Sequence, residues 1–166
     1  KSSAASDVYK RQGLDNFKKM FLEDDLFWTS FKVTFKFALI QVPIKLTVAL
    51  LVALVLSRST RLTSFYRAAF YIPSLMGGSV AIALLWKQLF SPKGVINQVL
   101  GFFGLPDSTA WLGNPKTALG TLIALGVWQF GSSMLIFLAA IKNIPQSYHE
   151  AAIVDGADPV RRFFSI

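Results

Sequence analysis

Three long apolar segments constrain the fold of this chain more than any other feature of its sequence. Two of them, residues 68–86 and 117–141, carry no charged side chain. A helix of about 20 apolar residues is long enough to cross a bilayer. The other segment, residues 33–56, qualifies if its lysines reach the membrane surface or face protein. The sequence therefore predicts an all-α, polytopic transmembrane bundle with three spans.

Composition excludes several other classes of protein. Hydrophobic residues make up 53% of the chain and charged residues 16%, against about 25% charged in soluble domains. Disordered chains are poor in apolar residues, and a soluble domain this small has little room for three helices that are apolar all round. With no cysteine and His149 as the single histidine, we expect neither a disulfide scaffold nor a metal site.

The charged residues predict a topology. The formal net charge is +8, and membrane proteins concentrate Lys and Arg in cytoplasmic loops. Residues 57–67 hold three arginines and no acid, so we expect them in the cytoplasm together with residues 142–166. The acidic segment 13–30 and the loop 87–116 are then expected outside. This order suits a multi-pass membrane protein.

The two ends of the chain carry an expectation about its origin. Residues 1–12 contain no apolar stretch and resemble a leader translated from cloning sequence. We therefore expect a non-native leader there, followed by one partial transmembrane domain in residues 13–166. That domain would end within a cytoplasmic loop, residues 145–166.

This last loop has the signals of a helix, a tight turn and a second helix. Pro145 suits a first helical turn, and Ser147 and Glu150 have the spacing of a capping box. Gly156 is a candidate helix end, where glycine adopts a left-handed conformation at low cost. Asp158, followed by proline, is a candidate N-cap for the next helix.

The spacing of this loop is E-A-A, two residues, D-G-A, five residues, F, two residues, I. It resembles the cytoplasmic EAA loop of permease subunits in bacterial ABC importers. Ordinary caps in a surface loop would explain any one of these residues but not all of them at this spacing. The matching residues are Glu150, Ala151, Ala152, Asp155, Gly156, Ala157, Phe163 and Ile166.

The resemblance extends over residues 13–166, where the chain is similar to permeases of the maltose and glycerol-phosphate type. It rests on Gly13-Leu14-Asp15-Asn16-Phe17, Tyr71-Ile72-Pro73-Ser74 and Trp128-Gln129-Phe130-Gly131-Ser132, among other motifs. It implies the fold of a type I ABC importer permease in a bacterial plasma membrane, with a loop that docks as a coupling helix on a cytoplasmic ATPase.

The implied partners are ATPase subunits, a second permease subunit and an extracytoplasmic solute-binding protein. The implied cargo is a sugar-like solute. ATP and Mg²⁺ would bind the ATPase, since this chain lacks the G-x-x-x-x-G-K phosphate loop. No catalytic motif suggests an enzyme, and the basic residues are scattered rather than gathered on one face as in a nucleic-acid binder.

Polar residues within the spans are candidates for a solute path, because such residues are costly in a membrane. Gln129, Ser132 and Ser133 would share a face of one continuous helix. They would line a passage or make interhelical hydrogen bonds. Gln41 and Lys45 are spaced alike, and Lys45 either lines the path or extends toward the membrane surface.

Three alternatives stay open at this stage. Pro73, Gly77 and Gly78 would either form a gate or only kink their span. A secondary transporter would want intramembrane carboxylates for ion coupling, and the three segments contain none. A non-transporting scaffold would not need the EAA spacing.

Ala49 and Ala53 have the spacing of a helix-packing face.

Overall fold

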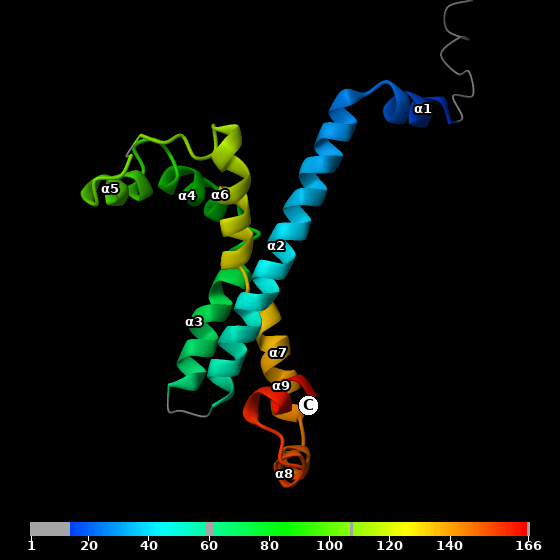
Figure 1. Cartoon of the computed structure of the whole chain (residues 1–166). Helices are drawn as coiled ribbons and strands as arrows, with labels where there is room; N and C mark the ends of the chain where they lie inside the picture. The colour runs from blue at the N-terminus through cyan, green and yellow to red at the C-terminus, as the bar shows by residue number, and fades with distance from the viewer. Residues whose placement is uncertain (1–13, 59–61, 107, 166) are drawn as a thin grey trace, which may run out of the picture. The chain divides into compact units, whose positions relative to one another are not determined.

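The computed structural model describes residues 14–58, 62–106 and 108–165, and those residues form helices and loops without a strand. The proposed leader, residues 1–12, and Ile166 lie outside them. The helices are α1 (Asp15–Leu22), α2 (Asp25–Ser57), α3 (Thr63–Met76), α4 (Val80–Leu89), α5 (Val95–Phe102), α6 (Pro115–Trp128), α7 (Gly131–Asn143), α8 (Gln146–Val154) and α9 (Pro159–Ser165) (Figure 1). The chain divides into two units, Lys1–Leu39 and Ile40–Ile166.

Helix α2 begins well before the predicted start at residue 33. The Asp24 carboxylate accepts backbone N–H groups from Leu26 at 2.9 Å and Phe27 at 3.2 Å. An aspartate that accepts from the second and third helical residues is an N-cap. The cap therefore sets the start of α2 at Asp25.

Helix α2 confirms the first predicted span. It continues through Pro43 for 33 residues and is long and apolar enough to cross a membrane. At 1.5 Å per residue its length is about 50 Å. Because the hydrocarbon core of a bilayer is about 30 Å thick, this length leaves room for polar residues near both ends.

The other two apolar segments are not single helices, which corrects the prediction for residues 68–86 and 117–141. Helices α3 and α4 are bent by 99° at their break, and α6 and α7 by 44°. The first break follows Gly77 and Gly78, and Ser79 restarts the chain as an N-cap that accepts from the N–H of Ile82. The described residues hold up to three spans if each bent pair counts as one.

The core of the second unit lies between α2 and α7, with α3 against α7 (Figure 1). Ala49 and Ala53 are fully buried, which confirms the packing face. They cluster with three larger side chains, Leu56, Met134 and Leu138. Most large apolar residues on these helices stay exposed, such as Val55 and Ile136, as a lipid-facing surface requires.

The loop segments of this unit lie at opposite ends of it. Helices α8 and α9 lie at the end where α2 finishes and α3 begins, and α4 and α5 lie at the other (Figure 1). At that other end, Asn97 is 1% exposed. Its amide nitrogen donates to the carbonyls of Ser91, Pro92 and Thr109, and its oxygen accepts the indole N–H of Trp111 at 2.7 Å. One buried side chain therefore holds this loop together.

Candidate functional site

Helix α8 starts at Gln146, two residues earlier than a capping box at Ser147 would allow. Pro145 occupies the N-cap position and has no side-chain cap bond. Ser147 lies inside the first turn instead, so the capping-box interpretation of Ser147 and Glu150 is wrong. The fixed φ of proline and its extended backbone direct the chain from α7 into α8.

The turn after α8 is a Schellman motif, as the glycine signal predicted. Gly156 has a φ of 72°. The N–H of Ala157 donates to the carbonyl of Ala152 at 2.9 Å, and the N–H of Gly156 donates to that of Ile153 at 3.0 Å. These two bonds satisfy carbonyls that the helix end would leave free. The left-handed residue reverses the chain within a few residues.

Asp158 caps α9, which confirms the second helix start. Its carboxylate accepts the N–H of Arg161 at 2.7 Å, and its carbonyl accepts that of Arg162 at 2.9 Å. Together with Gly156, this cap sets the geometry of the helix–turn–helix unit formed by α8 and α9. Both signals are local, so the unit does not depend on distant contacts for its turn.

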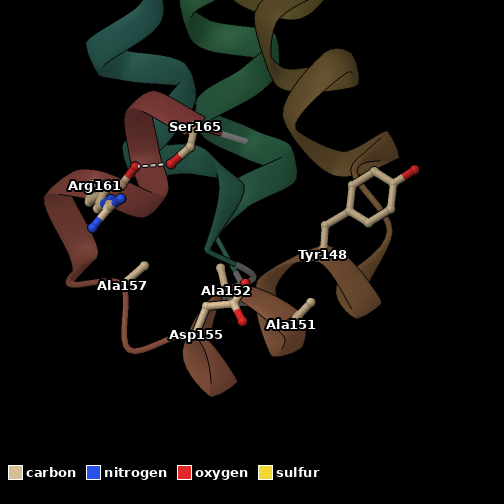
Figure 2. A pocket seen from close by; sticks show the side chains of 7 residues that line it. All are labelled: Tyr148, Ala151, Ala152, Asp155, Ala157, Arg161 and Ser165. Atoms are coloured by element: carbon tan, nitrogen blue, oxygen red, sulfur yellow. Dashed lines mark hydrogen bonds between the residues drawn. The ribbon is translucent and has the colours of Figure 1, made fainter.

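A pocket of about 540 Å³ lies between α8 and α9 (Figure 2). It is lined by Tyr148, Ala151, Ala152, Asp155, Ala157, Arg161 and Ser165. Three of these are alanines, which leave space where larger side chains would fill it. The Ser165 hydroxyl donates to the carbonyl of Arg161 within α9. The pocket therefore combines a small apolar floor with one acidic and one basic side chain.

The structure brings together part of the predicted loop set. Ala151, Ala152, Asp155 and Ala157 line the pocket, whereas Glu150 and Phe163 are exposed and do not line it. The sequence analysis did not select Tyr148, Arg161 or Ser165. Tyr148 had a usable signal, because it lies one helical turn before Ala152 and so shares its face.

The predicted polar face of Gln129, Ser132 and Ser133 does not exist as one helical stripe. Helix α6 ends at Trp128, Gln129 is its C-cap, and α7 begins at Gly131. Gln129 is half-buried beside Gly77, where an added Cβ would lie 2.1 Å from its Cδ. Ser132 is exposed and Ser133 half-buried.

Gln41 and Lys45 do share a stretch of α2, and both are half-buried. The Gln41 amide lies against Gly126 of α6, where an added Cβ would lie 1.9 Å from Nε2. Gln41 and Gln129 thus each fill the space beside a glycine. A glutamine that packs closely in this way keeps its polar end within the protein.

Ser74, which the sequence analysis did not propose as a site, joins the two bent helix pairs. Its hydroxyl donates to the carbonyl of Gln129 at 3.1 Å and accepts the N–H of Ser132 at 3.1 Å. Both backbone groups lie at the α6–α7 break, where regular helix bonding stops. A serine on α3 therefore stabilises the bend of another pair.

Comparison with known proteins identifies the family. The family model described as the inner membrane component of binding-protein-dependent transport systems matches residues 37–166. The chain belongs to this family. Its members are transport permeases rather than enzymes, as the sequence predicted, and the resemblance to ABC importer permeases is confirmed.

Three curated relatives support this assignment. The "Probable ABC transporter permease protein YesP" of Bacillus subtilis (strain 168) is 55% identical over 93% of this chain and 50% of its own length. The sn-glycerol-3-phosphate permease UgpA of Shigella flexneri is 37% identical, over 93% and 52%. The diacetylchitobiose uptake permease NgcF of Streptomyces coelicolor is 34% identical, over 95% and 48%. The chain spans about half the length of these relatives.

Proposed function

We propose that this chain is part of a permease subunit that imports a sugar or sugar-like solute, driven by ATP hydrolysis on a separate ATPase. A solute-binding protein would deliver the solute, and a second permease subunit would complete the pathway. ATP and Mg²⁺ would bind only the ATPase. The names of UgpA and NgcF, which refer to glycerol phosphate and a chitin disaccharide, support this solute class.

The observation that carries the coupling proposal is the helix–turn–helix unit of α8 and α9. It projects at one end of the packed helices and is reversed by a left-handed glycine. Ala151 is exposed, and Ala152 and Ala157 are half-buried beside it. Small side chains allow a partner backbone to approach closely, so this surface suits docking on a cytoplasmic ATPase.

The same proposal assigns sides to the membrane. Residues 57–67 and 142–166 would face the cytoplasm, and residues 13–30 and 87–116 the outside. The positions of α8–α9 and α4–α5 at opposite ends of their unit support this order. The solute would pass near Gln41, Lys45, Gln129, Ser132 and Ser133, of which Lys45 is the one charged group.

Cysteine cross-linking tests the docking surface, since the chain has no cysteine of its own. In the complete transporter, Ala151→Cys and Ala152→Cys are each paired with single cysteines in the ATPase. We expect disulfide or short-linker products, with Ala151→Cys giving the higher yield because it is exposed. Leu105→Cys, also exposed but in the loop at the other end, is the matched control and should give none.

Solute uptake by the complete transporter in membrane vesicles separates the rival functions. A secondary transporter would take up solute in vesicles that lack ATP and follow an ion gradient. A scaffold would show no uptake under either condition. Uptake that needs both ATP and the binding protein, together with the Ala151→Cys product, is the outcome that we expect. ATP-dependent uptake with no cross-linked product from Ala151→Cys or Ala152→Cys would overturn the assigned docking surface.

A further inference from the structure

The short helix α1 presents an apolar face that is largely exposed among the described residues. Leu14, Phe17 and Phe21 recur at positions i, i+3 and i+7, which places them on one side of a helix. All three are exposed. Lys19 lies on the opposite side of the helix, and Lys18 lies at the edge of the apolar face, four residues after Leu14 and three before Phe21. Both lysines are exposed. The helix is therefore amphipathic, with an apolar side that needs a partner.

Helix α1 is joined to a membrane span by a short turn. Only Glu23 and Asp24 separate it from α2, and the Asp24 cap starts α2 directly after the turn. The N-terminal end of α2 must reach the membrane surface, because α2 is longer than the hydrocarbon core. A helix attached there by two residues therefore ends within reach of that surface.

The two helices are joined by side chains typical of this depth. The indole N–H of Trp28 donates to the carbonyl of Phe21 at 2.9 Å, and that carbonyl belongs to the last turn of α1. The rings of Phe21 and Phe27 meet edge to face at 5.1 Å. Tryptophan is enriched where a membrane meets water, since its ring is apolar and its N–H needs a polar partner.

We propose that α1 lies in the lipid–water interface, with Leu14, Phe17 and Phe21 inserted among the acyl chains. Amphipathic helices with exposed aromatic residues bind membranes in this orientation. The contact is apolar rather than electrostatic, because the two lysines are offset by the acids Glu23, Asp24 and Asp25. The helix would act as an interfacial anchor that sets the depth and tilt of α2.

Spin labels on the two faces of α1 test this placement. Phe17→Cys and the matched control Lys19→Cys are made in the complete transporter and reconstituted into phosphatidylcholine vesicles. We expect the label at 17 to collide more with oxygen, which partitions into lipid, and the label at 19 to collide more with a water-soluble nickel chelate. Leu14→Cys repeats the test on the apolar face if Phe17→Cys fails to assemble.

Three results would overturn the proposal. Low collision with both reagents at 14 and 17 would mean that protein covers the face, whether a second permease or another segment. High collision with nickel at those positions would mean that the face is in water. Insertion that requires anionic lipid would mean an electrostatic contact. None of these outcomes depends on ATPase coupling, so a failed coupling test leaves this one intact.

A second variant tests the join between the helices. Trp28→Phe keeps an aromatic ring and removes the N–H that Phe21 accepts. We expect the label at 17 to remain in lipid but to become more mobile. An unchanged mobility would show that the indole bond does not hold α1 in place.

Discussion

The hydroxyl of Ser74 bridges the carbonyl of Gln129 and the N–H of Ser132, each at 3.1 Å, although both residues lie more than 50 positions after Ser74 in the chain. A helix break within a membrane leaves backbone groups that water cannot satisfy. Here a side chain of α3 satisfies one donor and one acceptor at the α6–α7 bend. The bend is therefore a stabilised element of the fold and is tied to α3.

Replacing Ser74 with alanine should destabilise the permease. Ser74→Ala leaves one carbonyl and one N–H without their partner, at a cost of about 1–2 kcal/mol. Thermal unfolding of the purified complete permease in detergent measures this loss. The control is Ser132→Ala, which keeps the backbone N–H and removes an exposed hydroxyl. Equal melting temperatures for the two variants would contradict the bridging role.

The approach of α3 to α7 should tolerate no side chain at Gly131. A Cβ there would lie 2.3 Å from the carbonyl oxygen of Phe70 and 2.8 Å from the Cα of Tyr71. Both are backbone atoms, so the helices must move apart. We expect Gly131→Ala to cost about 1–3 kcal/mol, as overpacked cores do.

Gly120 of α6 provides the matched control. A Cβ at this position meets nothing within 4 Å. Alanine favours a helix interior over glycine by about 0.5–1 kcal/mol, so Gly120→Ala should raise the melting temperature slightly while Gly131→Ala lowers it. Two shifts of the same sign would show that helix propensity, and not the close approach to Phe70, governs Gly131.

The two bends show what the sequence can and cannot predict. The α3–α4 break has local signals in Gly77, Gly78 and the capping residue Ser79, and the sequence already predicts a gate or a kink at the two glycines. The α6–α7 break has no such cap, and its backbone groups are satisfied by Ser74, far away in the chain. Hydropathy identifies both segments as apolar but is insensitive to bonds of this kind.

The candidate site divides in the same way. Gly156 and Asp158 are turn and cap signals whose partners lie within a few residues, and the structure has them as predicted. The pocket could not be predicted without the geometry of the turn, because Arg161 and Ala152 line the same pocket only after the chain reverses. The stripe through Gln129 was wrong because it assumed a continuous helix.

Asn97 should be essential for the order of the loop between α4 and α6. Asn97→Ala removes the side chain that three carbonyls and the Trp111 indole share. Leaving buried polar groups unpaired should cost about 2–3 kcal/mol. We expect faster amide hydrogen exchange across residues 90–114, together with a red-shifted contribution of Trp111 to the fluorescence.

The neighbouring Gln98 is the control for this prediction. It is exposed and makes one side-chain bond, to the carbonyl of Lys93 at 3.2 Å. Gln98→Ala should leave exchange in the loop nearly unchanged. Asn97→Asp separates the two roles of Asn97, since it keeps the acceptor for Trp111 but loses the donors. If Asn97→Asp exchanged as slowly as the natural loop, the bonds that the Asn97 amide donates would not be what orders it.

Gly156 and Gly104 together test whether the left-handed turn after α8 couples transport to ATP. Among the described residues, they are the two with positive φ, at 72° and 71°, and an added Cβ meets nothing within 4 Å at either. Alanine at either position therefore costs only backbone strain, about 1–2 kcal/mol. The two variants are matched in strain and differ in place.

We expect the paired variants to lose similar stability and to differ in activity. Gly156→Ala should strongly reduce ATP hydrolysis stimulated by the binding protein, because the α8–α9 surface would no longer match the ATPase, whereas Gly104→Ala should retain it. Gly156→Asn should recover part of the activity, since asparagine adopts the left-handed region more readily than alanine. Equal losses in both alanine variants would mean that global stability limits the assay, and full activity in Gly156→Ala would show that this turn does not transmit the ATPase cycle.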